Sequence, residues 1–248
     1  MKILVCISHV PDTTSKINFT ADNTEFDTNG VQYVINPYDE FSLARAMWFK
    51  EKQGASITVV TVGDASTEPS LRKSLAIGAD DAIRIDTEAV DGFSVAKQLA
   101  EIVKANNYDL ILTGRESIDY NGAMVPGMLA TIIDYNFVNA CVGLEIDGES
   151  ATVTKEIDGG TETFSTSLPL VIAGQKGLVE EKDLRIPNMR GIMMARKKPL
   201  TVAAAIETTA STKINSFQKP EEKSACKMVE ATNLDSLIDL LHNEAKVI

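Results

Sequence analysis

The chain has 248 residues, a hydrophobic content of 44% and a formal net charge of −11, values typical of an ordinary soluble globular protein of one large or two small domains. The negative balance argues against general nucleic-acid binding, and no apolar run approaches the roughly 18–20 residues that a membrane span needs. The three cysteines, Cys6, Cys141 and Cys226, lie too far apart in the sequence for a metal-ligand cluster and suit a reducing compartment, so we expect a cytoplasmic protein.

Short β-rich runs alternate with helical patterns through the first half of the chain. The predicted strands are 2–8, 56–62, 82–85 and 108–114, and the predicted helices are 39–53, 67–78 and 92–107. This alternation predicts an α/β fold with a mostly parallel sheet and helices on both faces, similar to a Rossmann fold. We expect helix caps at or near Asp39, Thr67 and Ser94, and helix ends at Gly54 and Gly78.

The pattern changes after about residue 137. The turn pairs Asp147-Gly148 and Gly159-Gly160 are typical of β-hairpins. They predict a small antiparallel extension with strands near 140–146, 150–157 and 161–166, followed by a buried strand at 168–174.

The segment 185–198, RIPNMRGIMMARKK, concentrates five basic residues and three methionines in an otherwise acidic chain. One interpretation is a basic surface loop with a short helix. The other is a partner-recognition segment, because methionines adapt to varied apolar surfaces and positive charge steers acidic partners. Pro187 and Gly191 predict that 185–191 is not regular helix.

The chain ends in a polar, weakly patterned arm and a helical pattern. We expect residues 207–231 to form a linker or arm, and Asn233 to cap a helix with an apolar stripe. The domain prediction is therefore an α/β domain at 1–206, which includes the antiparallel strands and a recognition loop at about 180–198, followed by an arm and helix at 207–248.

The loop 114–127, GRESIDYNGAMVPG, is the main candidate ligand site. It lies between a predicted strand and a predicted helix, where α/β proteins hold phosphates, and it is longer than most such loops. A polar turn without a ligand is the alternative, because the chain has neither GxGxxG nor a Walker loop. The segment 34–41 is a second candidate, although its spacing favours a simple helix cap at Asn36-Pro37.

The remaining polar residues do not form a recognisable catalytic group. His9 and His242 each stand alone, and Glu116 and Asp119 are better explained as acids of a solvated turn than as an acid/base pair. We therefore expect no catalytic residue, no metal site and no enzyme activity of the chain's own.

Four segments in series resemble the β (small) subunits of the electron transfer flavoprotein family. They are MKILVCISHVPDT, INPYDEFSLARA, TGRESIDYNGAMVPGMLA and GLVEEKDLRIPNMRGIMMARKKPL, and they run in order over roughly residues 1–202. The resemblance implies an electron carrier, a heterodimer with a larger α subunit that holds most of the FAD, and AMP as a structural ligand of β. It also implies that primary dehydrogenases, such as the acyl-CoA dehydrogenases of fatty acid beta-oxidation, reduce the FAD, and that a membrane quinone oxidoreductase accepts the electrons.

The resemblance also assigns site residues. The AMP-binding positions are Cys6, Asn36, Pro37, Tyr38, Asp39, Val62, Arg115, Glu116, Ser117, Ile118, Asp119, Tyr120, Asn121, Gly122, Ala123, Met124, Val125 and Pro126. The partner-recognition positions are Arg185, Met189, Arg190, Gly191, Ile192, Met193, Arg196 and Lys197, with Met189 as the side chain that enters a pocket of the dehydrogenase. The family often has glutamine at the position of Met124 and the reverse order of Pro126-Gly127, so we expect ligand contacts there to come from backbone N–H groups.

Two other functions remain open. Some members of the family bind a second FAD in place of AMP and bifurcate electrons from NADH, and VPDT at 10–13 and KDLR at 182–185 resemble those members. A stand-alone ATP-binding protein or enzyme on a similar sheet is the alternative from another class.

Overall fold

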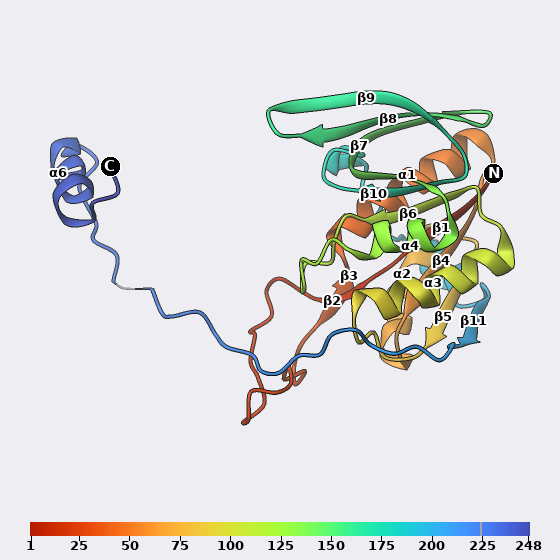
Figure 1. Cartoon of the computed structure of the whole chain (residues 1–248), viewed down its shortest axis with the longest axis horizontal. Helices are drawn as coiled ribbons and strands as arrows, with labels where there is room; N and C mark the ends of the chain where they lie inside the picture. The colour runs from red at the N-terminus through yellow and green to blue at the C-terminus, as the bar shows by residue number, and fades with distance from the viewer. Residues whose placement is uncertain (224) are drawn as a thin grey trace.

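A nine-stranded sheet forms the centre of the computed structural model, which describes residues 1–223 and 225–248 (Figure 1). Ser224, in the predicted arm, lies outside the described residues. The strands, in their order across the sheet, are β11 (Leu200–Ala204), β5 (Asp81–Asp86), β4 (Ser56–Val62), β1 (Lys2–Cys6), β6 (Leu110–Gly114), β10 (Leu170–Gly174), β7 (Asn136–Asp147), β8 (Ser150–Ile157) and β9 (Gly160–Ser167).

The sheet is parallel from β11 to β7 and antiparallel from β7 to β9. The predicted α/β fold with an antiparallel extension is therefore confirmed. The two outermost antiparallel strands, β8 and β9, form the hairpin at the top of Figure 1.

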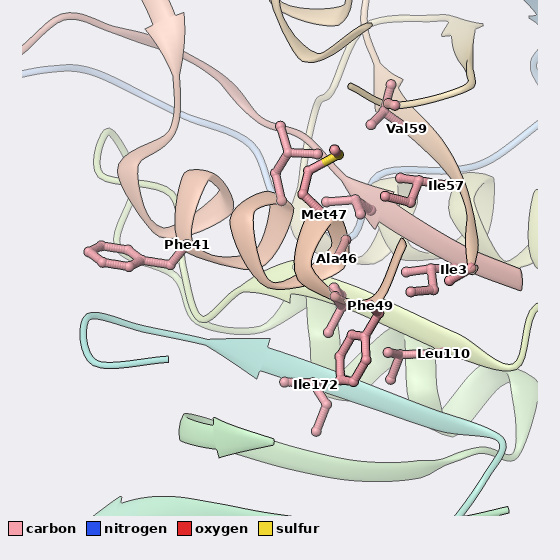
Figure 2. Packing of buried hydrophobic residues seen from close by; sticks show 14 of the residues in the cluster. Ile3, Phe41, Ala46, Met47, Phe49, Ile57, Val59, Leu110 and Ile172 are labelled. Atoms are coloured by element: carbon pink, nitrogen blue, oxygen red, sulfur yellow. The ribbon is translucent and has the colours of Figure 1, made fainter. Parts of the chain in front are cut away.

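Helices cover both faces of the parallel part because its strands are apolar on both faces. On β1, Ile3 and Val5 point to one hydrophobic cluster, and Leu4 and Cys6 point to another. The first cluster includes side chains of α1 (Pro37–Gln53) and α2 (Glu68–Ile77), and the second includes side chains of α3 (Gly92–Asn106) and α4 (Val125–Ile133). Figure 2 shows Phe49 of α1 between Leu110 and Ile172 of the sheet. Each such fully buried aromatic ring contributes about 1.5–3 kcal/mol through burial.

The helix ends were predicted well, and Thr67 is the N-cap residue of α2, but the caps of α1 and α3 lie three residues before Asp39 and Ser94, at Asn36 and Asp91. Helix α1 begins at Pro37, so Asp39 lies inside its first turn, and Thr67 at the start of α2 makes no side-chain cap bond. The cap of α3 is Asp91, which forms a capping box with Ser94. Gly54 ends α1 in the left-handed conformation, as predicted.

Three strands were missed or merged in the sequence prediction. The first predicted strand, 2–8, ends at Cys6, and the chain then forms β2 (His9–Pro11), which pairs with β3 (Tyr33–Ile35) in a separate two-stranded sheet. The third strand that the sequence analysis did not predict is β11, which pairs with β5 at one edge of the main sheet.

The basic segment and the chain's end form two further helices. Helix α5 (Met189–Ala195) includes Gly191, so the prediction that 185–191 contains no regular helix was wrong from residue 189 onward. Helix α6 (Leu234–Asp239) has the predicted Asn233 cap and continues into the π-helical turn η3 (Leu240–Glu244). In Figure 1 these last elements lie at the end of a long extended arm, away from the sheet.

Candidate functional site

The strand order reverses beside β1, which is the position where open α/β sheets form a ligand-binding crevice. On one side of β1 the sheet continues with β4 and β5, and on the other side it continues with β6 and β10. In open α/β sheets, ligands bind at the carboxyl ends of the strands where this order reverses. At this position the loop that follows β6, residues 115–124, faces the chain that follows β1.

Asp39 joins the two strand ends of the crevice. Its carboxylate oxygens accept hydrogen bonds from the Ser8 backbone N–H after β1 and from the Gly114 backbone N–H at the end of β6, both at 2.7 Å. The side chain is buried, and burial raises the pKa of Asp39 to about 7, although these hydrogen bonds act in the opposite direction. A Cβ on Gly114 would lie 2.4 Å from the Asp39 carboxylate, so this position of the strand end requires glycine. Asp39 therefore holds the ends of β1 and β6 together beside the crevice.

Asn36 holds the candidate loop against the start of α1. Its fully buried amide donates to the Glu116 carbonyl oxygen at 2.9 Å and accepts from the Ile118 backbone N–H at 3.2 Å. It makes no side-chain cap bond to α1, so the simple-cap interpretation, which the sequence spacing favoured, was wrong. The segments 34–41 and 114–127 are thus joined by hydrogen bonds.

The exposed part of the loop presents backbone donors. Asn121 and Ala123 both have positive φ values, 49° and 50°, and alternating left-handed residues turn successive N–H groups toward one side. Among the described residues, the backbone N–H groups of 122–125 donate to no other group, and the start of α4 has no side-chain cap. Unpaired N–H groups at a helix N-terminus form a binding site for phosphate or another anion.

The other predicted ligand positions differ in how deeply they are buried and in which element carries them. Tyr38 is half-buried, Pro37 is exposed, and Val62 ends β4 on the neighbouring strand. Cys6 is buried at the end of β1, where burial raises the pKa of its thiol far above the usual range. The Arg115 guanidinium donates to Gln175 Oε1 at 3.2 Å and lies 3.5 Å from Glu116, so a charge-assisted bond to a ligand would require it to change partners.

The small sheet beside the crevice was not predicted to belong to the site. Tyr33 of β3 stacks on His9 of β2 with ring centroids 4.5 Å apart, and His9 Nδ1 lies 2.9 Å from Ser70 Oγ of α2. Desolvation of the Tyr33 hydroxyl, with the nearby Asp119 charge, raises the pKa of Tyr33. The short run Tyr33-Val34-Ile35, made of aromatic and β-branched residues, was the sequence signal for this strand.

His9 of the two-stranded sheet has a structural environment. Burial lowers the pKa of His9, which favours the neutral ring, and its stacking and hydrogen bond give it a structural role. Within residues 1–223 and 225–248, no group of three or more histidine, cysteine, aspartate or glutamate side chains can hold a metal ion. In the same residues, no helix combines the length and the apolar composition required to cross a bilayer.

A second candidate site lies on α5. Its exposed apolar side chains include Met189, Met193 and Met194, and Ile186 just before the helix is 90% exposed. Solvent-exposed large apolar side chains that gather in one segment are typical of a protein-binding surface.

Two of the five basic residues in 185–198 make contacts within the domain. Arg185 pairs with Glu51 of α1 at 2.8 Å, and the Lys198 ammonium donates to backbone carbonyl oxygens of α2 and of the turn after it. Arg190, Arg196 and Lys197 form no ion pair with any described residue, so their charges are not compensated within the described structure.

Comparisons with known proteins identify the family to which the chain belongs. The family model "Electron transfer flavoprotein domain" matches residues 24–208. Three relatives carry the name electron transfer flavoprotein subunit beta. The Bacillus subtilis protein is 34% identical over 262 residues and covers 100% of both chains, and the Syntrophomonas wolfei protein is 40% identical over 227 residues, 91% of this chain and 88% of its own. The mitochondrial protein of Arabidopsis thaliana is 32% identical over 257 residues and covers 100% of both chains. The chain therefore belongs to the electron transfer flavoprotein family, among its β subunits.

Proposed function

We propose that this β subunit forms a heterodimer with an α subunit and carries electrons from primary dehydrogenases, such as acyl-CoA dehydrogenases, to a membrane quinone oxidoreductase. In this proposal the α subunit holds most of the FAD that accepts and releases the electrons. The β subunit contributes a scaffold and a docking segment, with no catalytic residue of its own. The C-terminal helix α6 packs on the α subunit.

The single observation that carries the proposal is the exposed surface of α5. Met189 is 75% exposed and Met193 is 65% exposed, and the unpaired charges of Arg190 and Arg196 lie in the same segment. Flexible apolar side chains beside positive charge suit transient contact with several acidic partners, because charge accelerates association and methionine fits pockets of different shape.

The crevice beside β1 supports AMP as the ligand of β. The unpaired N–H groups of 122–125 at the start of α4 would hold the phosphate, and no side chain caps that helix in its place. The Asn36 and Asp39 contacts fix the loop that presents them. AMP bound here would stabilise the loop and the two strand ends.

Extraction of nucleotides from the heterodimer tests this assignment. The chain is coexpressed with its α subunit, the purified complex is denatured, and the released nucleotides are quantified. We expect one FAD and one AMP per heterodimer. Two FAD and no AMP would instead support the bifurcating function, and a chain that is purified alone and hydrolyses ATP would support the stand-alone enzyme.

Met189→Ala tests the docking segment. Truncation removes the exposed side chain assigned to the dehydrogenase pocket, and we expect the KM for the reduced dehydrogenase to rise roughly tenfold, as at a binding hot spot. FAD content should not change. Ile157→Ala, at an exposed apolar position at the end of β8, is the matched control. Unchanged electron transfer in Met189→Ala would show that α5 is not the docking segment.

A further inference from the structure

We propose that Arg72 and Lys198 are positioning residues that hold α5 on α2 and thereby present its exposed face to the dehydrogenase. The proposal rests on the docking role of α5 described above and adds the residues on which that role depends. Neither side chain needs to touch the partner. Together they form what we call the clasp. Arg72 of α2 binds backbone carbonyl groups at the end of α5, and Lys198, just after α5, binds backbone carbonyl groups at the end of α2.

Arg72, on α2, binds the end of α5. Its Nη1 donates to the carbonyl oxygens of Ala195 and Lys198, both at 2.9 Å. The last carbonyl groups of a helix have no partner within the helix, and a charged donor there satisfies them and interacts favourably with the helix dipole.

Lys198, just after α5, binds the end of α2 in the same way. Its Nζ donates to the Leu75 carbonyl oxygen at 2.9 Å and to the Ala79 carbonyl oxygen at 2.5 Å. Burial lowers the pKa of Lys198, and the nearby Lys50 charge adds to this effect. A partly buried ammonium with two carbonyl acceptors is committed to the domain rather than to an external partner.

Close backbone contact explains the glycine in the basic segment. A Cβ added at Gly191 would lie 2.3 Å from the Ala76 carbonyl oxygen of α2, which no side chain can tolerate without a shift of the helices. Ala195, one turn later, is buried in the main hydrophobic cluster. Gly191 and Ala195 therefore face inward, and Met189 and Met193 remain on the exposed part of the helix.

The clasp matters because α5 has only seven residues. A helix of two turns is not stable in water by itself, so its conformation depends on tertiary contacts. The inward contact comes from two small residues, which bury little apolar area. The charged contacts of Arg72 and Lys198 are thus a large part of what keeps 189–198 in one conformation, and a docking face with a fixed conformation loses less entropy on binding.

Arg72→Met in the coexpressed heterodimer tests the proposal against a neighbour on the same helix. Methionine keeps the length and apolar stem of the side chain but removes both hydrogen bonds to the 195–198 backbone. Lys73→Met is the matched control, because Lys73 pairs with Glu40 of α1 and makes no hydrogen bond or ion pair with a described residue of α5. Arg72→Lys retains a charge that reaches one carbonyl group and should restore part of the effect.

Two measurements are made on each complex. Hydrogen–deuterium exchange of peptides that cover 189–198 should be at least about tenfold faster in Arg72→Met than in Lys73→Met. The KM for the reduced dehydrogenase should rise roughly three- to tenfold with kcat and FAD content unchanged, since the flavin is not affected.

The outcomes separate this proposal from the function on which it rests. Equal exchange in Arg72→Met and Lys73→Met overturns the clasp, and faster exchange with an unchanged KM overturns its positioning role. If the unmodified complex accepts no electrons from any acyl-CoA dehydrogenase, the proposed function fails, whereas the exchange comparison still decides whether Arg72 holds α5.

Discussion

At the scale of single residues, the buried carboxylate of Asp39 has an unusual environment. Among the described residues it forms no ion pair, and it is stabilised by hydrogen bonds from the backbone N–H groups of Ser8 and Gly114. The thiol of Cys6 is its nearest titratable neighbour on β1, and both groups favour their neutral forms because they are buried. Ionisation of Asp39 should therefore affect the stability of the crevice near neutral pH.

Asp39→Asn tests this at a series of pH values. Because the pKa of Asp39 in the folded chain, about 7, lies above the ordinary 3.8, its contribution to stability is complete below about pH 4 and is lost as the pH rises through 7. The unfolding free energy of the unmodified chain, relative to Asp39→Asn, should therefore fall by a few kcal/mol between about pH 4 and 8 and stay constant above this range. Urea unfolding measures the difference.

Asp158→Asn, at an exposed hairpin turn, is the control for the loss of one carboxylate. Its stability relative to the unmodified chain should show no comparable change with pH. Parallel profiles for the unmodified chain and Asp39→Asn would contradict the raised pKa.

At the scale of elements, the first part of the C-terminal arm is bound to its own domain. The side-chain amide of Gln98 on α3 exchanges two hydrogen bonds with the Ile206 backbone, and Asp91 Oδ2 accepts from the backbone N–H groups of Ser211 and Thr212. Phe217 stacks on Phe19 with centroids 4.8 Å apart. Figure 1 shows this part of the chain passing beneath the sheet before the arm leaves the domain. The linker predicted from 207 onward is therefore fixed up to about residue 219.

Asp91→Ser separates the two roles of Asp91. Serine is a good N-cap, so α3 should keep its capping bond to the Ser94 backbone, whereas the second carboxylate oxygen that holds the arm is lost. We expect the thermal midpoint to change little and limited proteolysis within 207–219 to become roughly five- to tenfold faster. Gln218→Ala, which keeps the hydrogen bonds from the Ser211 and Thr212 backbone to Asp91, is a suitable control. Equal cleavage rates would mean that the Asp91 contacts do not hold the arm.

The same elements show how far the sequence predicts the structure. The parallel strands were predicted because apolar, β-branched runs such as 56–62 keep their pattern in any context, and that strand was predicted with its observed bounds. The two halves of the crevice, Asn36 and the loop at 116–118, are 80 or more residues apart, so their contact follows only from the strand order. Gly191 was misassigned as a helix breaker because its role depends on the distance to α2, which no local pattern contains.

At the scale of the whole molecule, the chain divides into a packed domain and an outlying end. No hydrogen bond or ion pair joins residues 225–248 to residues 1–223 in the described structure, and the contacts of the end region, such as Lys227 with Glu244, lie within it. The apolar stripe of α6 is exposed, with Leu234 at 63% and Ile238 at 55%. An amphipathic helix gains its stability by burying such a stripe, so we expect this helix to pack on a surface outside the chain.

Deletion of residues 232–248 tests whether that surface belongs to the α subunit. Because residues 232–248 make no hydrogen bond or ion pair with described residues of the domain, the thermal midpoint of the isolated chain should change by less than about 1 °C. Loss of the buried stripe should weaken association with the α subunit at least about tenfold, measured by titration of the two separately purified subunits. A full-length chain with Leu237→Ser and Ile238→Ser should show the same weakening, because it removes the stripe while it keeps the polar face and the Asn233 cap. If the deletion destabilises the isolated chain instead, α6 packs on its own domain. If neither variant alters association, the α subunit contacts the β domain without this helix.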